Sequence, residues 1–461
     1  TPIDRDIVLG TVAMGTTQDL DDAVAAARRA QPGWAATPWQ DRLAILRAAA
    51  ELISDRLMDL SALMSYEVGK NRIEALGEVE ESADLIRYYA QTMEDNAGYD
   101  HPLDNLGDAA AHTRSILRPH GVFAVVSPFN FPMALAAGPT SAAMMAGNTV
   151  VFKPSSASPL SAVKLMEAYL AAGVPAGVVN LVMGPGETVG QALQDHPGID
   201  GIVFTGSYDV GMRLFHAFSK QWPRPCIVEM GGKNPLVVLA DADLTYAVDS
   251  AAFGIFFHQG QVCMASSKVI VEEPLFARFA DAFTAKAMGI KVGDPRSPDT
   301  VVGPLIRPQQ CAFIRGQLDD AIAKGATLLT GGTFEGAYFQ PTVLAGVTPE
   351  MRIYHEESFG PVTSLIRARD SEHALEIAND TVYGLSSAII TNDLQKAFDF
   401  AMRSESGMVH INDATISDES HIPFGGVKNS GFGREGGMLS MEEVTELKWI
   451  SVQLGQRTYP F

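Results

Sequence analysis

The chain of 461 residues has a globular composition, with 46% hydrophobic and 19% charged residues. A single hydrophobic core stops growing well below this length, so we expect at least two domains. The net charge of −20, from 54 acidic and 34 basic residues, argues against nucleic acid and anionic membranes as partners, because phosphate groups require a basic surface.

The cysteines and the apolar segments bear on the compartment. The three cysteines are Cys226, Cys263 and Cys311, and an odd, sparse set is not a disulfide framework. A reducing cytoplasm is therefore the simplest location. The most apolar stretch, residues 121–152, is broken by prolines and asparagines, whereas a membrane helix needs ~20 largely uninterrupted apolar residues. We expect no membrane span and recognise no targeting segment.

The first third of the chain is predicted to be helical. Thr17 is the expected N-cap of a helix that starts at Gln18. Longer helical patterns cover residues 41–68 and 73–96. Residues 105–119 then change to polar residues and short β-prone pieces.

Short β-rich runs next alternate with helical stretches, which predicts parallel sheets with right-handed crossovers. The first series has strands at 122–126, 149–152, 178–183 and 201–205, and helices at 132–146, 160–172, 188–194 and 210–219. A second series has strands at 236–239, 268–271, 362–366, 387–390 and 409–411, and a lone strand is expected at 446–452. The sequence therefore predicts two α/β domains.

Cys263 follows a polar run, residues 259–261, which predicts a loop. A lone cysteine in an apolar setting is usually a buried structural residue, and Cys263 taken alone favours that interpretation. Loops, however, are where reactive side chains tend to lie. The neighbouring motifs decide between the two interpretations.

Two polar residues lie at the ends of predicted strands. Glu229 follows the strand 226–228 and precedes two glycines, so it lies at the edge of the sheet where open α/β proteins bind ligands. It is either a solvated, inert carboxylate or a half-buried base whose pKa moves towards the working pH. Asn130 lies between two prolines, as turn residues do, but its carboxamide could also donate to an oxyanion.

Glycine-rich segments suggest a phosphate site without establishing one. Residues 204–211 follow a strand and open a helix, whose N-terminus could bind a pyrophosphate. Their G-x-x-x-x-G spacing lacks the usual dinucleotide fingerprint, and residues 184–187 could be only a turn. The sequence contains no H-E-x-x-H, no C-x-x-C and no P-loop, so no metal site and no ATP chemistry are predicted.

Seven collinear segments together resemble the aldehyde dehydrogenase superfamily: 127–132, 149–154, 204–211, 229–235, 260–263, 356–362 and 423–435. The resemblance spans almost the whole chain and implies two doubly wound parallel-sheet domains with a small β oligomerisation arm. The implied cofactor domain is 1–103 and 120–231, the catalytic domain 232–437, and the arm 104–119 and 438–461. Because an exposed edge strand is a liability unless paired, a homodimer or homotetramer is expected.

The resemblance also implies the chemistry. The Cys263 thiolate would add to an aldehyde carbon, the Asn130 carboxamide and the Cys263 N–H would hold the oxyanion, and a hydride would pass to NAD or NADP. Glu229 would activate the water that hydrolyses the resulting thioester. Glu357 would hold the nicotinamide ribose and Lys153 the adenosine ribose. The full set implied for the cofactor is Ser127, Pro128, Phe129, Lys153, Ser156, Gly186, Gly206, Ser207, Met230, Gly231, Glu357 and Phe359.

One departure from the family pattern concerns the cofactor. The family's Lys-x-x-Glu is here Lys153-Pro154-Ser155-Ser156. A glutamate at the last position would repel a 2′-phosphate by like charge, and Ser156 removes that repulsion. We therefore expect NADP to be tolerated as well as NAD.

The loop 412–422 lines the aldehyde entrance in family members. Here it carries three carboxylates and neither Arg nor Lys, so an anionic aldehyde has no obvious anchor in it. Its length and its ending resemble the benzaldehyde, salicylaldehyde and vanillin dehydrogenases. The predicted substrate is an uncharged aromatic or medium aliphatic aldehyde, held between apolar walls: Phe131, Leu135, Val262, Ile416 and Phe424.

Three alternatives remain at this point. The CoA-acylating branch of the family generally lacks the glutamate base, which is present here as Glu229. A semialdehyde dehydrogenase, of the succinic semialdehyde or pyrroline-5-carboxylate type, is weakened by the missing basic anchor. A catalytically inactive binding or structural protein on the same fold would be free to lose Cys263, Asn130, Glu229 or Glu357, and all four are present.

Overall fold

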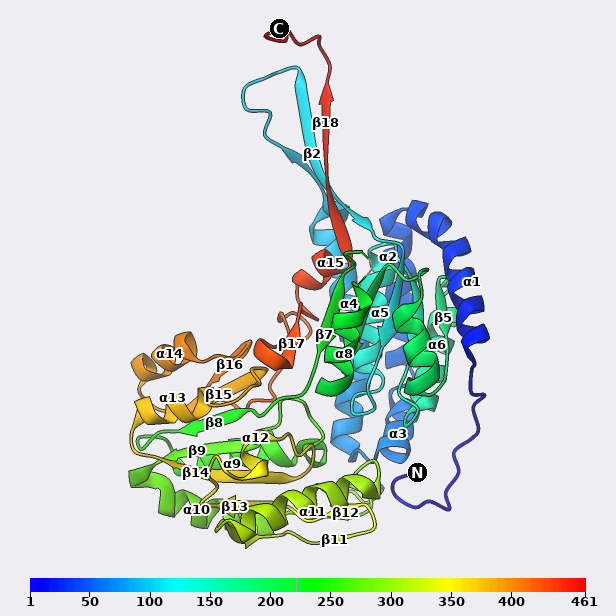
Figure 1. Cartoon of the computed structure of the whole chain (residues 1–461). Coiled ribbons are helices and arrows are strands. Elements are labelled where there is room, and N and C mark those ends of the chain that lie inside the picture. The colour runs from blue at the N-terminus through cyan, green and yellow to red at the C-terminus, as the bar shows by residue number, and fades with distance from the viewer. Residues whose placement is uncertain (221) are drawn as a thin grey trace.

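The computed structural model describes residues 1–220 and 222–461. This part of the chain forms two α/β units, each built on its own sheet, and a small antiparallel sheet that projects away from them (Figure 1). The expected α/β class with two mainly parallel sheets is confirmed.

The six-stranded sheet has the strand order β17-β7-β6-β3-β4-β5. All its neighbouring pairs are parallel except β17 and β7. The central strands are buried along almost their whole length, as continuous apolar runs in a sheet covered on both faces should be. The strands are β3 (Val122–Val126), β4 (Thr149–Lys153), β5 (Val179–Leu181), β6 (Gly201–Thr205), β7 (Cys226–Glu229) and β17 (Gly431–Phe432).

The helices of this unit agree with the predicted ones except at some boundaries. Thr16, rather than Thr17, caps the first helix, because it forms a capping box with Asp19. The predicted helix 41–68 is two helices, separated at residues 55–56. The helices are α1 (Thr17–Ala36), α2 (Trp39–Ser54), α3 (Leu57–Val68), α4 (Arg72–Asp95), α5 (Ala134–Met145), α6 (Pro159–Ala171), α7 (Gln191–Asp195) and α8 (Tyr208–Phe218), with a π-turn at Gly186–Gly190.

The seven-stranded sheet has the order β10-β13-β14-β9-β8-β15-β16, and only its edge strand β10 is antiparallel to its neighbour. The sequence did not predict β10 or β13. The strands are β8 (Pro235–Val238), β9 (Lys268–Glu272), β10 (Thr327–Thr330), β13 (Thr342–Ala345), β14 (Val362–Ala368), β15 (Ser386–Ile390) and β16 (Met408–Ile411). This unit also contains a short hairpin of β11 (Phe334–Glu335) and β12 (Tyr338–Phe339). Its helices are α9 (Leu244–Phe256), α10 (Glu273–Met288), α11 (Pro308–Ala323), α12 (Arg352–His355), α13 (Ser371–Asn379) and α14 (Leu394–Arg403).

The isolated β segments of the sequence form the third sheet, with the order β1-β2-β18. Strand β1 (Asp100–Leu103) pairs with β2 (Ala111–Pro119), which pairs along nine residues with β18 (Thr445–Gln453). Helix α15 (Leu439–Glu443) leads into β18. The paired strands extend well beyond both units (Figure 1). Leu447 and Trp449 on β18 are 71% and 67% exposed, so this sheet carries an apolar surface that the chain itself does not cover.

The two units meet where the chain passes from β7 to β8. Residues 230–234 connect the end of one sheet to the start of the other. Strand β17 returns from the C-terminal part of the chain and pairs with β7, with Gly431 opposite Glu229. Glu229 and the glycines after it therefore lie at the junction of the two sheets.

Candidate active site

Glu229 is the last residue of β7 and is buried. Its Oε2 accepts a hydrogen bond from the Gly426 N–H at 3.3 Å, and its Oε1 has no hydrogen-bond partner among the described residues. Burial and the nearby Glu435 carboxyl raise the pKa of Glu229 well above its ordinary value. A carboxylate with a free oxygen and a raised pKa is suited to take a proton from water.

The segment before Cys263 has an unusual backbone. His258 and Gln259 have φ angles of 44° and 56°, and Gly260 follows with 68°. Such conformations cost of order 1–3 kcal/mol for non-glycine residues and persist only when the surroundings impose them. Here the His258 N–H donates to Glu74 at 2.8 Å and the Gln259 side chain donates to the Gly69 carbonyl at 2.5 Å.

Cys263 itself is half-buried, and its carbonyl accepts a hydrogen bond from the Asn234 carboxamide at 2.8 Å. Burial raises the pKa of the thiol well above its ordinary value, and the carboxyls of Glu357, Asp418 and Glu229 raise it further. Both effects favour the protonated form of the thiol. It has acidic groups around it that can accept its proton.

Asn130 lies in the connection from β3 to α5 and is buried. The next residue, Phe131, packs its ring edge-on against the His258 ring, with centroids 5.7 Å apart. The Nζ of Lys70 lies 3.5 Å from the centroid of the Phe131 ring. The turn that contains Asn130 and the loop that leads to Cys263 are thus in direct contact, although they come from different units.

The residues expected to bind the adenosine half of the cofactor gather at the carboxyl edge of the six-stranded sheet. The Ser127 N–H donates to the Lys153 carbonyl at 3.2 Å, and the Ser156 hydroxyl donates to the Gly184 carbonyl at 3.3 Å. A Cβ at Gly190 would lie 3.6 Å from the Lys153 side chain, which places Lys153 beside the π-turn that begins at Gly186. Burial lowers the pKa of Lys153.

Gly206 and Ser207 lie at the next strand end. The Gly206 N–H donates to the Glu229 carbonyl at 2.9 Å, so this N–H is already used within the protein. Ser207 is the N-cap residue of α8, which is where a pyrophosphate would meet a helix N-terminus. A Cβ at Gly211 would lie 2.5 Å from the Met230 sulfur, so glycine there lets α8 approach the residue after Glu229.

The residues expected around the nicotinamide lie at the junction. The Glu357 carboxylate accepts a hydrogen bond from the Gly232 N–H at 3.0 Å, and a Cβ at Gly231 would lie 2.2 Å from it. Burial raises the pKa of Glu357 to about 7. The Phe359 and Phe129 rings meet edge to face with centroids 5.9 Å apart. Residues from both units thus lie together at the junction, and Glu357 is near enough to Cys263 to raise the pKa of its thiol.

The expected apolar walls of the aldehyde pocket divide into two groups. Val262 and Ile416 are buried members of one hydrophobic cluster, against which Phe131, Phe424 and Cys263 pack. Leu135 lies half-buried in the first turn of α5 and belongs to none of the apolar clusters of the described residues. Four of the five predicted pocket residues are therefore in the apolar environment of Cys263.

The sequence did not identify every residue that shapes this site. Glu435, in a segment matched to the family without an assigned role, accepts a hydrogen bond from the Thr205 hydroxyl at 2.8 Å, and burial raises its pKa to about 7. Lys70, Glu74 and Glu78 were not singled out at all. Charged residues on a helix are usually solvated, so no sequence pattern distinguishes the few that tertiary packing buries.

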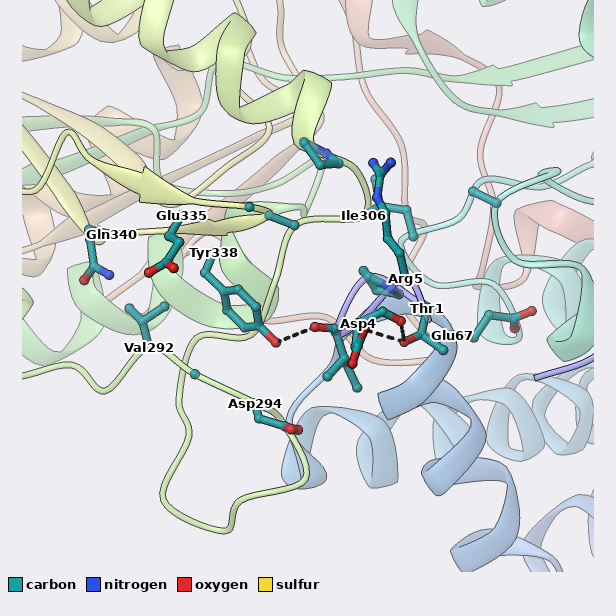
Figure 2. Close-up of a pocket in the computed structure, with 17 residues that line it drawn as sticks. Thr1, Asp4, Arg5, Glu67, Val292, Asp294, Ile306, Glu335, Tyr338 and Gln340 are labelled. Atoms are coloured by element: carbon teal, nitrogen blue, oxygen red, sulfur yellow. Dashed lines mark hydrogen bonds between the residues drawn. The ribbon is translucent and has the colours of Figure 1, made fainter. Parts of the chain in front are cut away.

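A separate pocket of about 780 Å³ lies between the N-terminal segment 1–5 and the seven-stranded unit. Figure 2 shows Asp4, Tyr338 and Asp294 among its lining residues, and the Tyr338 hydroxyl donates to the Ile3 carbonyl at 3.1 Å. None of the predicted site residues lines this pocket. This pocket is therefore distinct from the candidate active site around Cys263.

Three further properties concern the described residues, 1–220 and 222–461. No group of three or more His, Cys, Asp or Glu side chains among them is arranged to hold a metal ion. None of their helices combines the length and the apolar composition needed to cross a membrane. All three cysteines are free thiols.

Comparison with known proteins identifies the class. The model of the aldehyde dehydrogenase family matches residues 1–450, and the chain belongs to that family. Benzaldehyde dehydrogenase YfmT of Bacillus subtilis is 38% identical, over 98% of this chain and 92% of its own. Vanillin dehydrogenase of Pseudomonas fluorescens is 38% identical, over 100% of this chain and 95% of its own. The protein is an aldehyde-oxidising oxidoreductase, as the resemblance implied.

A solved structure supports the fold as well. Glyceraldehyde-3-phosphate dehydrogenase GapN from Methanocaldococcus jannaschii, in complex with NADP, superposes with a TM-score of 0.93 and 33% identity over 97% of both chains. The overall fold of this chain is therefore shared with that enzyme.

Proposed function

We propose that this protein oxidises an uncharged aromatic or medium aliphatic aldehyde to the carboxylic acid, with NAD or NADP as the hydride acceptor. The observation that carries the proposal is that three features meet at the junction of the two sheets. They are the loop that leads to Cys263 (the nucleophile loop), the turn that contains Asn130 (the asparagine turn) and the buried Glu229. Relatives named benzaldehyde and vanillin dehydrogenases support the aromatic substrate.

Cys263 is the nucleophile. Because its surroundings favour the protonated thiol, a carboxylate in the site must take the proton before the sulfur attacks. The C–S bond then forms and the carbonyl oxygen becomes an oxyanion. The Asn130 carboxamide and the Cys263 backbone N–H donate to that oxygen. Loss of a hydride from the same carbon leaves a thioester on Cys263.

Glu229 completes the reaction. It takes a proton from water, the water oxygen adds to the thioester carbon, and the C–S bond breaks to release the acid and the Cys263 thiolate. The raised pKa of Glu229 makes its carboxylate a stronger base than an ordinary glutamate. A glutamate in this position favours hydrolysis over transfer to coenzyme A.

The residues present fit a nicotinamide cofactor. The buried Ser127 hydroxyl has no partner within the described residues, and the lack of a side chain at Gly231 lets the Glu357 carboxylate lie at the junction, where a Cβ would be 2.2 Å from it. When bound, the cofactor accepts the hydride from the aldehyde carbon. Lys153 would contact the adenosine ribose. Ser156 offers a hydroxyl where a carboxylate would repel a 2′-phosphate, so we infer that NADP is accepted as well as NAD.

The charges near the pocket support an uncharged substrate. Among the described residues, the cation that lies over the ring of an expected wall residue is Lys70, above Phe131, and its Nζ lies 2.7 Å from Glu78. A cation that is already neutralised and fully buried is a poor anchor for a substrate carboxylate. Asp418, on the entrance loop, adds negative charge near the thiol. These charges disfavour succinic semialdehyde.

The first test is the formation of reduced cofactor at 340 nm with benzaldehyde and either NAD or NADP, without coenzyme A. We expect activity in the wild type and none in Cys263→Ala. A higher kcat/KM for succinic semialdehyde than for benzaldehyde would refute the substrate class. Activity in Cys263→Ala equal to that of the wild type would refute the mechanism, and a wild type inactive with every aldehyde would favour the inactive-protein alternative.

We further propose that residues 104–119 and 438–461 form an oligomerisation arm, with 1–103 and 120–231 as the cofactor domain and 232–437 as the catalytic domain. The exposed Leu447 and Trp449 favour burial of this arm against a second copy, in a homodimer or homotetramer. Sedimentation of the wild type and of Trp449→Lys tests it. The free cysteines suit a reducing, cytoplasmic location.

A further inference from the structure

Helix α4 carries two buried carboxylates on one face. Glu74 and Glu78 are four residues apart, so they lie one above the other on the helix, and their exposed fractions are 4% and 1%. A carboxylate in such surroundings is costly unless it accepts hydrogen bonds or is paired. Both find partners in the predicted active site rather than in solvent.

Each carboxylate accepts a backbone N–H from a different half of the site. Glu74 accepts from His258, five residues before Cys263, at 2.8 Å. Glu78 accepts from Met133, three residues after Asn130, at 2.9 Å. One helix therefore bonds both to the loop that carries the nucleophile and to the turn that carries the carboxamide.

Lys70, in the turn before α4, completes the arrangement. Its Nζ is 2.7 Å from Glu78, and both side chains are fully buried. The same ammonium lies over the Phe131 ring, next to Asn130. The preceding residue, Gly69, accepts the Gln259 side chain through its carbonyl. Lys70 thus balances the charge of Glu78 and packs against the asparagine turn.

The arrangement matters because the two expected oxyanion donors come from different units. Asn130 follows β3 of the six-stranded sheet, whereas Cys263 follows α9 of the seven-stranded unit. Their relative position is not set by any one sheet. The left-handed backbone at His258 and Gln259 also needs outside contacts to persist. The contacts to Glu74 and Gly69 provide them.

We propose that Lys70, Glu74 and Glu78, here named the α4 cluster, are positioning residues that hold the Asn130 carboxamide and the Cys263 N–H at a fixed separation. This inference rests on the proposed function. The cluster touches neither substrate nor cofactor. It acts through the His258 and Met133 N–H groups, and its loss displaces the two oxyanion donors relative to each other.

Two matched pairs of variants test the cluster, and each pair differs by one hydrogen-bond acceptor. Glu74→Gln keeps an acceptor for the His258 N–H, whereas Glu74→Leu removes it. The double variant Lys70→Met/Glu78→Gln removes both charges but keeps an acceptor for the Met133 N–H. The double variant Lys70→Met/Glu78→Met removes both charges and also this acceptor. Replacing a buried ion pair by apolar groups of similar volume is often tolerated, so the second pair is informative if Glu74→Leu fails to fold.

We expect each acceptor-free variant to lower kcat for benzaldehyde by roughly 10- to 100-fold, because displacements near 1 Å cost about that much. The glutamine variants should stay within about threefold of the wild type. The Kd of NADPH, from protein fluorescence, should be unchanged. Asn71 and Glu74 form the capping box of α4, in which each side chain accepts the backbone N–H of the other. Asn71→Ala is the matched stability control, since it removes the Asn71 acceptor and the Asn71 bond to the Val301 carbonyl without touching His258.

The outcomes separate the inference from the proposed function. If the acceptor-free variants keep wild-type kcat, or if Asn71→Ala loses kcat as they do, the cluster is only structural and the inference is wrong. Alkylation of Cys263 by iodoacetamide, followed by peptide mass, gives a readout that does not need turnover. We expect the rate of Cys263 alkylation in Glu74→Leu to differ at least several-fold from that in the wild type. If the two rates are equal and the wild type also shows no turnover, both proposals are wrong.

Discussion

Gly260 offers the sharpest test of how the nucleophile loop is held. A Cβ at this position would lie 2.2 Å from the Gly360 carbonyl oxygen and 2.5 Å from its carbon, both backbone atoms that no side-chain rotation can move. The φ angle of 68° adds the strain that any L-residue has in the left-handed region, roughly 1–2 kcal/mol. In Gly260→Ala the oxygen contact must lengthen to at least 3.0 Å, which is a displacement approaching 1 Å three residues before Cys263.

A displacement of that size predicts a kcat about 10²-fold below the wild type, measured as reduced cofactor formed from benzaldehyde. Gly325→Ala is the matched control, because Gly325 also has a positive φ, of 102°, but a Cβ there meets nothing within 4 Å. It should lose stability from strain alone and keep wild-type kcat. If Gly260→Ala retained more than a third of the wild-type kcat, the reasoning about a rigidly packed loop would be refuted.

Four further changes test the site. Glu229→Gln should give a burst of one reduced cofactor per active site followed by turnover slowed about 10²- to 10⁴-fold, seen by stopped flow, because the thioester forms but is not hydrolysed; steady turnover without a burst would contradict this. Asn130→Ala should lower kcat about 10²- to 10³-fold with an unchanged Kd for NADPH. Glu435→Gln removes a negative charge that raises the pKa of Glu229, so the pKa of Glu229 should fall and the acidic limb of the deacylation pH profile should move to lower pH; a shift to higher pH would be inconsistent with that charge. Ser156→Glu should lower kcat/KM for NADP at least about tenfold relative to NAD, by like-charge repulsion of the 2′-phosphate.

The sequence by itself determined the class of fold and the family. Alternating β-rich and helical segments require parallel sheets, and β3, β4 and β6 lie within a residue of the predicted ranges because their apolar runs are local. Boundaries that depend on one hydrogen bond were less certain. Thr16 and Thr17 are equally good caps by type, and only the reciprocal bond with Asp19 selects Thr16.

Tertiary structure decided what local patterns cannot encode. Strands β10 and β13 were missed because no helix separates them: the chain runs from α11 through β10, β11 and β12 to β13, so the strand–helix alternation that marked the other strands is absent there. Lys70, Glu74 and Glu78 have the composition of a solvated helix face, yet the packing of α4 against the asparagine turn and the nucleophile loop buries all three. Whether a charged side chain meets water or a backbone N–H depends on the partner that folding brings to it, and that partner lies here more than fifty residues away in the chain.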